Sequence, residues 1–368
     1  MSARAWLTAV SILVAVPCAA QVPQVTPTPP DFPRGRISGY VFGDYYYNVA
    51  GDPVHHYSAS GSDSDKVNID NSTAQQIGKD LDGLQIRRIY FQLDNDLSIK
   101  YSTRFRLEAD SKSLTSDGKI GVALRTAHLQ VHSIYPRADM FVGLIATPIW
   151  ESSEDFWAYR SIEKTIADFR GLGSSMDLGV ELKGFADSNH HFGYSAMVGD
   201  GTGQKPEDNR DKKVMLGLPV CWGDFRLEPF VDYENVFNGQ DRATYKAFAG
   251  YEFKKAAAGV EVVDRVNHRP AGNQEPFGFS AFVRGTPWST LAAFGRFDLW
   301  QADRRADNRV DSQLWIAGLD WQPFPDVHFM PNIEATQFDA KGTDVAPAHQ
   351  ELQARMTFYY RFSRPQST

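Results

Sequence analysis

Apolar and polar residues alternate with a period of two along much of the chain, most clearly in its last segment. From Leu352 to Phe362 every second residue is apolar or aromatic, and the residues between them are mostly polar. This alternation is typical of a β-strand with one apolar and one solvated face. At about eleven residues, the segment is long enough to cross a bilayer as a tilted strand.

A second segment, Ile99 to Asp110, has the same pattern with a more highly charged face. Its polar face carries Lys100, Ser102, Arg104, Arg106, Glu108 and Asp110. On a soluble sheet this face would contact bulk solvent, whereas on a membrane barrel it would line a water-filled lumen.

The same period predicts about sixteen strands in the chain, each uncertain by about two to four residues at its ends. We expect them at 35–47, 84–94, 97–110, 120–134, 139–147, 176–186, 190–199, 212–222, 224–237, 242–254, 256–266, 276–285, 288–300, 312–322, 326–338 and 350–362. Short and long connections mostly alternate between them, as in bacterial outer-membrane barrels. We therefore predict an all-β, antiparallel transmembrane barrel over residues 35–362, wide enough to hold an aqueous channel.

The two ends of the chain lie outside this pattern. Residues 1–20 are typical of a secretory signal peptide, with Arg4, an apolar stretch and small residues before Gln21. Lipidation at Cys18 is a less favoured alternative, because Pro17 precedes it where a small residue is expected. Residues 21–34 are rich in proline and predict a semi-rigid periplasmic tail. Residues 363–368 form a short extension.

Composition excludes only a few classes of protein. The net charge of -7 argues against a nucleic-acid-binding protein, and one cysteine, Cys221, follows the predicted signal peptide. No later segment approaches 18 consecutive apolar residues, so no transmembrane helix is expected. The mean hydropathy of -0.39 is compatible with a membrane barrel, since alternation dilutes the apolar content of each strand.

The long connection between the strands at 139–147 and 176–186 is the main candidate for a functional element. It is rich in charge and also contains aromatic residues, and Ser161 to Arg170 could form a short helix. We expect it to fold against the inner wall as a constriction loop, although a cap on the outer surface is the alternative. Its charged residues are Glu151, Glu154, Asp155, Arg160, Glu163, Lys164, Asp168 and Arg170.

Charged residues on the inward faces of the predicted strands are candidates for the pore lining. They are Lys100, Arg104, Arg106, Glu108, Arg125, Glu181, Lys183 and Arg296. Because both signs occur, the preference of such a pore for anions or cations is left open.

Several short stretches, in order, resemble the phosphate-selective porin O/P family of bacterial outer-membrane porins. They are Val142–Pro148, Ser161–Thr165, Asp177–Val180, Tyr194–Gly201 and the polar loop Glu207–Lys213. The resemblance covers Leu84–Lys213 and implies a trimeric diffusion channel whose third loop lies inside the pore. It does not establish phosphate selectivity, because the dense arginine ladder of that family is not evident.

The predicted function is passive diffusion of small hydrophilic solutes or inorganic ions, including anions such as phosphate, across the outer membrane of a Gram-negative bacterium. The expected partners are those solutes, outer-membrane lipid and two further copies of the chain, with no nucleic acid. We find no motif for a catalytic site, a metal site or a cofactor. A barrel enzyme, which would need a Ser/His or acid/His group at the rim, and a secreted all-β binding protein remain the alternatives.

Overall fold

The computed structural model describes residues 32–53, 67–68, 75–115, 117–207, 209–236, 239–270, 272–343 and 348–365. The predicted signal peptide and most of the proline-rich tail lie outside these residues. Within them, no helix has both the length and the apolar character needed to cross a membrane.

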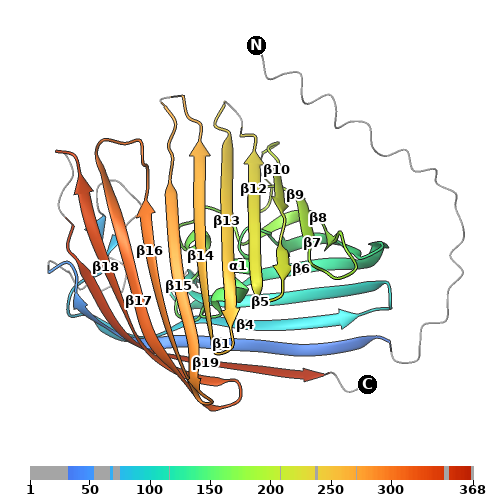
Figure 1. The fold of residues 1–368 in the computed structure, drawn as a ribbon, viewed down its shortest axis with the longest axis horizontal. Coiled ribbons are helices and arrows are strands. Elements are labelled where there is room, and N and C mark those ends of the chain that lie inside the picture. The colour runs from blue at the N-terminus through green and yellow to red at the C-terminus, as the bar shows by residue number, and fades with distance from the viewer. Residues whose placement is uncertain are drawn as a thin grey trace, which may run out of the picture.

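The described strands pair in a closed, antiparallel ring (Figure 1). In chain order around the ring they are β1 (Arg34–Ala50), β4 (Asp82–Asp96), β5 (Tyr101–Leu114), β6 (Ile120–Tyr135), β7 (Ala138–Ala146), β8 (Met176–Phe185), β9 (Gly193–Gly199), β10 (Lys213–Gly217) with β11 (Val220–Trp222), β12 (Phe225–Glu234), β13 (Arg242–Phe253), β14 (Ala256–Asn267), β15 (Phe277–Trp288), β16 (Leu291–Gln301), β17 (Arg309–Phe324), β18 (Val327–Lys341) and β19 (Glu351–Pro365). The last strand, β19, pairs with β1 and closes the barrel.

The barrel has sixteen strands when β10 and β11 count as one, since both pair with β12. The interruption falls at Leu218 and Pro219, and Pro219 has no N–H to donate to the ladder. The sixteen-strand prediction is therefore confirmed. The small hairpin of β2 (Val67–Asn68) and β3 (Gln75–Gln76) lies in a connection where no strand was expected.

Connections alternate in length around the ring. Short turns such as 136–137, 254–255 and 325–326 lie at one end, where β1 begins and β19 ends. Long connections such as 147–175 and 200–212 lie at the other. Some strands extend slightly beyond the predicted limits: β1 begins at Arg34 instead of 35, and β19 ends at Pro365 instead of 362. Others are shorter, since β5 begins at Tyr101 instead of 97 and β12 ends at Glu234 instead of 237.

The two faces of the wall differ in the way the alternation predicts. Apolar residues of the strands point outward and are exposed, such as Val122 and Met356. Their polar neighbours point inward and are covered, such as Glu108 and Thr357. An apolar exterior around a polar interior is the reverse of a soluble protein and matches a barrel surrounded by lipid.

Aromatic residues expected near the strand ends mostly follow the same rule. Those that lie exposed on the outside include Tyr45, Tyr47, Trp288, Trp315, Trp321 and Tyr360. Trp300, which was grouped with them, instead packs inside the barrel against the segment between β7 and β8. Its direction follows the alternation of β16, because Trp300 lies on the same face as Arg296 and Asp298.

Candidate functional site

The connection between β7 and β8, residues 147–175, lies against the inside of the barrel wall. It contains α1 (Glu151–Trp157) and α2 (Ile166–Phe169). Helix α1 contacts β13, β14 and β15, and α2 contacts β14 and β15. Figure 1 shows α1 behind β13 and β14, within the ring of strands. We call residues 147–175 the inner loop.

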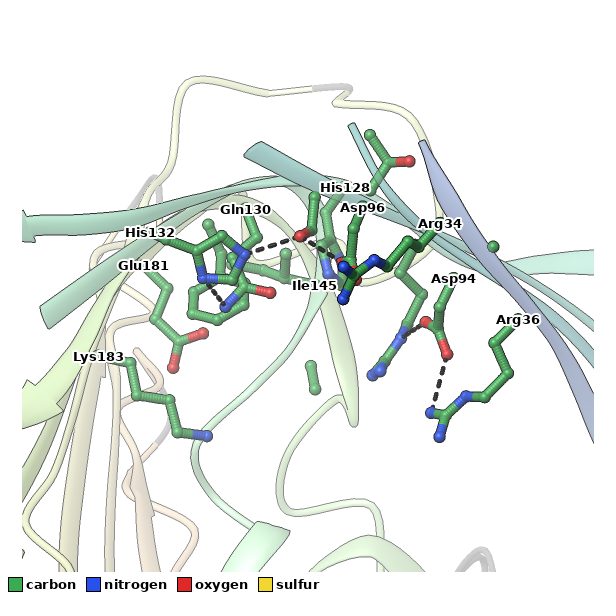
Figure 2. Close-up of a pocket in the computed structure, with 16 residues that line it drawn as sticks. Arg34, Arg36, Asp94, Asp96, His128, Gln130, His132, Ile145, Glu181 and Lys183 are labelled. Atoms are coloured by element: carbon green, nitrogen blue, oxygen red, sulfur yellow. Dashed lines mark hydrogen bonds and ion pairs between the residues drawn. The ribbon is translucent and has the colours of Figure 1, made fainter. Parts of the chain in front are cut away.

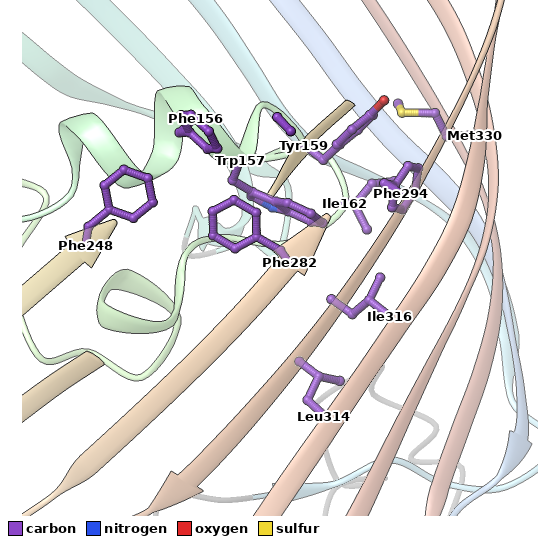
Figure 3. Packing of buried hydrophobic residues seen from close by; sticks show 11 residues of the cluster. Phe156, Trp157, Tyr159, Ile162, Phe248, Phe282, Phe294, Leu314, Ile316 and Met330 are labelled. Atoms are coloured by element: carbon purple, nitrogen blue, oxygen red, sulfur yellow. The ribbon is translucent and has the colours of Figure 1, made fainter. Parts of the chain in front are cut away.

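An apolar band on the inward face of the wall holds the inner loop in place (Figure 3). Trp157 is fully buried, with its ring centroid 5.2 Å from that of Phe282 and 6.1 Å from that of Phe294. The loop contributes Phe156, Trp157, Tyr159 and Ile162, and the wall contributes Phe248, Ala257, Phe282, Phe294, Leu314, Ile316 and Met330. Burying these aromatic rings together stabilises the loop on β13–β18.

The helical content of the inner loop differs from the prediction of one helix over Ser161–Arg170. Only Ile166–Phe169 is helical there, while α1 lies earlier, where no helix was expected. Ile162 and Ile166 are buried as predicted, but Phe169 is exposed.

A polar anchor from β4, which only β19 and β1 separate from β18, reaches the tip of the inner loop. Arg87 on β4 donates to the carbonyl oxygens of Ser161 at 3.2 Å and Ile162 at 2.5 Å. It also forms an ion pair with Glu163 at 3.3 Å and lies 3.6 Å from Asp44 on β1. The loop tip is thus held between β18 and β4.

The position of Arg87 depends on a β-bulge. The register between β1 and β4 shifts so that Phe42 pairs with Arg88 and Gly43 with Ile86. Arg87 is the extra residue, and the side chains of both Arg87 and Arg88 point into the barrel. Strict alternation would turn one of them outward. Neither was among the predicted pore-lining residues.

The charged residues of the inner loop form one compact network. Arg160 is 3.2 Å from Glu154 and 3.5 Å from Asp168, and Lys164 is 2.9 Å from Asp168. Arg170 instead lies over the rings of Phe169 and Trp300. Asp155 is exposed, Glu163 is paired with Arg87, and the side chain of Glu151 lies outside the described residues.

Burial changes the titration of this network. It raises the pKa of Glu154 to about 7, because the nearby charge of Arg160 offsets only part of the desolvation and Asp168 adds repulsion. Burial also lowers the pKa of Arg170 to about 10. Desolvation opposes ionisation of Asp168 as well, but Lys164 and Arg160 outweigh it and hold the pKa of Asp168 below its usual range.

The wall facing this network, on β4–β6, is rich in arginine. Arg88 pairs with Glu108, and Arg125 lies 3.2 Å from Glu108 and donates to the Ser175 hydroxyl at 2.6 Å. Arg104 pairs with Asp94 at 2.6 Å. Arg125 sits at a second bulge, where Arg106 pairs with Thr126 and Leu107 with Leu124.

Arg106 differs in its contacts from the other arginines on β4–β6. Its Nε donates to the amide oxygen of Gln92 at 2.6 Å, and its guanidinium lies 5.5 Å from the ring centroid of Tyr90. Among the described residues it has no ion pair with a carboxylate.

The other predicted wall residues have separate surroundings. Glu181 accepts from Ser195 at 2.5 Å, and Arg296 pairs with Asp298 and donates to the Lys164 carbonyl oxygen at 2.5 Å. Lys183 lines a lumen cavity. Lys100 requires a correction, because β5 begins at Tyr101; Lys100 lies exposed in the turn and donates to the Ser133 carbonyl oxygen.

A cavity of about 620 Å³ opens at the short-turn end of the barrel (Figure 2). Its lining is polar and carries both signs of charge, with Arg34, Arg36, Asp94, Asp96, Arg104, Glu181 and Lys183. It is lined by residues of β1 and β4–β8, of which Ser102, Arg104, Glu181 and Lys183 were predicted to face water.

This cavity also contains the Ser/His/acid group that the sequence did not reveal. The Ser102 hydroxyl is 2.7 Å from His132 Nε2, and His132 Nδ1 is 3.2 Å from Asp139. However, the Ser102 hydroxyl donates its proton to Asp96 at 2.7 Å. A hydroxyl has one proton, so His132 is not positioned to remove it as a general base.

Comparison with solved structures places this fold among outer-membrane proteins. The anion-selective porin from Comamonas acidovorans aligns with a TM-score of 0.63 and 11% identity over 89% of this chain and 100% of that one. The outer membrane channel DcaP of Acinetobacter baumannii gives 0.64 and 11%, over 89% and 97%. OmpT of Vibrio cholerae gives 0.58 and 11%, over 89% and 98%.

Sequence comparison adds no closer assignment. No protein-family model matches the chain, and no curated protein matches its sequence. The resemblance to the phosphate-selective O/P family therefore remains an expectation from short motifs. The ring of strands and its structural neighbours agree on one point: the chain has the fold of the outer-membrane porins, a closed transmembrane barrel of sixteen antiparallel strands.

Proposed function

We propose that this protein is a porin that lets small hydrophilic solutes and inorganic ions diffuse passively across the outer membrane of a Gram-negative bacterium. The observation that carries the proposal is the inner loop. It is fixed to one side of the wall by an apolar band and carries Glu154, Arg160 and Asp168 as an ion-paired network inside the barrel. Such a loop narrows an aqueous pore while leaving its lining polar.

The narrowest part of the pore lies, in this proposal, between the inner loop and β4–β6. Arg125 donates to Ser175 of the inner loop, and its charge favours the ionised forms of Glu154 and Asp168, which supports a close approach of β6 to the loop network. Opposite charges on the two sides give a field across the pore and weaken any preference for one ion sign.

We expect the pore to prefer anions modestly over cations. Arg106 has no carboxylate partner among the described residues, and Glu154 is about half protonated near pH 7. Both features leave a small excess of positive charge, which would favour inorganic anions such as phosphate. Guanidinium groups suit these anions because their N–H donors replace lost water.

We extend the proposal to the assembly and its export. A neighbour, OmpT of Vibrio cholerae, has been solved in a trimer form, which supports a homotrimer here. Export through the signal peptide at 1–20, and contact of the outward apolar face with outer-membrane lipid, complete the proposal. We propose no catalytic role, because the hydrogen bond to Asp96 takes the Ser102 proton.

Planar-bilayer recording tests the function directly. The purified protein, added to a lipid bilayer in KCl, should produce stepwise increases in current, and a salt gradient should give a reversal potential of the sign for anions. A folded, heat-modifiable barrel that inserts without conductance would contradict the porin assignment. A cation-signed potential would contradict only the anion preference.

A further inference from the structure

A second lumen cavity, of about 450 Å³, lies between the inner loop and the wall of β1 and β17–β19. Its wall side carries Tyr40 and Phe42 from β1, His328 from β18 and Tyr359 from β19. Its loop side carries polar residues, including Asp155 and Arg160. Binding sites for small molecules have this size and combine apolar rings with a few polar groups.

The rings on the wall form a continuous arc over four neighbouring strands. The Tyr40 centroid lies 4.5 Å from that of Tyr90 on β4 and 5.9 Å from that of Tyr359. Tyr359 in turn is 5.3 Å from the His328 ring. Tyr40 and Phe42 are nearly parallel, at 10° and 6.3 Å. Of these rings, Tyr40 and Tyr359 are half-buried and offer apolar surface inside a polar lumen, whereas Tyr90 and Phe42 are buried beside them.

Ion pairs compensate the charges around this cavity. Arg160 is paired with Glu154 and Asp168, Arg361 with Asp326, and His328 with Asp320 at 2.8 Å. An ionic solute would have to compete with these pairs, which cost free energy to break. A neutral solute with hydroxyl groups can instead add hydrogen bonds, because a hydroxyl both donates and accepts.

We infer that the arc Tyr40–Tyr359–His328 is a binding subsite for neutral cyclic polyols of the monosaccharide class. The C–H face of a pyranose ring would pack on the tyrosine rings, and its hydroxyl edge would face Asp155, Arg160 and Gln322 across the cavity. The inference rests on the proposed porin function and assigns it a solute class. Solutes of this class move through the pore along the aromatic wall.

Current blocking by sugars tests the subsite in the whole protein. D-glucose and D-sorbitol have similar size and hydroxyl content, but only glucose has a rigid ring face. We expect glucose to reduce the KCl current of wild-type channels at a half-blocking concentration about three-fold to ten-fold lower than sorbitol, as expected for one or two ring contacts. D-glucuronate, a ring with a carboxylate, should block less than glucose.

Two variants test whether the tyrosine rings in the cavity cause the preference for glucose over sorbitol. Tyr40→Leu and Tyr359→Leu keep apolar volume but remove a flat ring, and each should bring glucose close to sorbitol. Tyr360→Leu, which changes the exposed outward neighbour on β19, is the matched control and should behave as wild type.

The outcomes distinguish a failure of the proposed sugar subsite from a failure of the proposed porin function. Equal blocking by glucose and sorbitol in wild type overturns the subsite without using any variant. An unchanged glucose preference in both lumen variants also overturns it, and stronger blocking by glucuronate overturns the neutral class. Absence of any KCl current contradicts the porin function itself.

Discussion

The inner wall of the barrel differs between its two sides, although both face the same enclosed space. On β13–β18 it carries an apolar band that is covered by the inner loop. On β4–β6 it carries arginines paired with carboxylates, such as Arg88 with Glu108 and Arg104 with Asp94. The loop packs on the apolar side by burying aromatic rings, and the charged side meets the loop through polar contacts such as the hydrogen bond from Arg125 to Ser175.

The same comparison explains an apparent exception to alternation. Phe248 and Phe282 point inward, where a water-filled barrel would favour polar residues. They are not exposed to the lumen, because Phe156 and Trp157 of the loop cover them, with Phe156 5.4 Å from Phe248 between ring centroids. An inward apolar residue in such a barrel therefore indicates a covering segment.

Removing the central ring of the apolar band should have the largest effect. Trp157→Ala deletes a fully buried side chain, and a buried Trp→Ala change costs about 3–5 kcal/mol. We expect the inner loop to detach locally while the strands persist. Trypsin added to proteoliposomes should then cleave after Arg160, Lys164 or Arg170, and single-channel conductance should rise.

Trp315→Ala is the control for this change, because Trp315 is exposed on the outside of the same barrel. It should leave the loop resistant to trypsin. Equal cleavage in both variants would indicate a general loss of barrel stability and not a detached loop.

Breaking the polar anchor should have the next largest effect. Arg87→Gln removes the donor to Ser161 and Ile162 and leaves Glu163 without its cation, at a cost of about 1–3 kcal/mol. The loop tip should fluctuate, which single-channel recordings would detect as rapid current noise.

A double-mutant cycle sharpens this prediction. Glu163→Gln combined with Arg87→Gln should cost less than the sum of the two changes, because the first removes the carboxylate that the second leaves unpaired. Arg36→Gln, in an exposed pair with Asp94, is the charge-matched control and should add no noise. Strict additivity would show that Arg87 and Glu163 do not interact.

Replacing Arg106, which has no carboxylate partner among the described residues, should change ion selectivity and leave stability nearly unaffected. Arg106→Gln should lower the anion-over-cation permeability ratio by up to about five-fold at low salt, since one charge near a passing ion contributes about 1 kcal/mol in water. The effect should shrink as salt screens it. Reversal potentials in a KCl gradient measure this ratio.

Arg226→Gln removes the same charge from a half-buried position near the start of β12, at the short-turn end of the barrel and away from the inner loop. We expect it to change the ratio much less than Arg106→Gln. Equal shifts from the two changes would mean that only the overall charge of the molecule matters.

The smallest effect concerns pH. Because the pKa of Glu154 is about 7, this carboxyl is mostly charged at pH 8 and mostly neutral at pH 6. Acidification therefore removes negative charge from the inner loop, and anion preference should increase as pH falls through 7. Glu154→Gln should keep the low-pH value throughout. A wild-type preference that is flat from pH 8 to 6 would contradict this assignment.

The sequence by itself determined the strands and which face of each points outward. Alternation is a local property with a period of two, so it can be followed from residue to residue without knowledge of distant partners. The connection lengths then indicated a closed barrel, and the long charged segment before β8 was identified as the main candidate element. These predictions required no long-range contact.

Only the tertiary structure decided which inward residues meet. The bulge that turns Arg87 inward beside Arg88 shifts the phase of alternation and has no signature in the local pattern. Arg87 and Ser161 are 74 residues apart in sequence, and their contact depends on closure of the ring. The side on which the loop packs, and the arc of Tyr40 and Tyr359, depend on the same closure, because strands distant in sequence become neighbours only in the finished barrel.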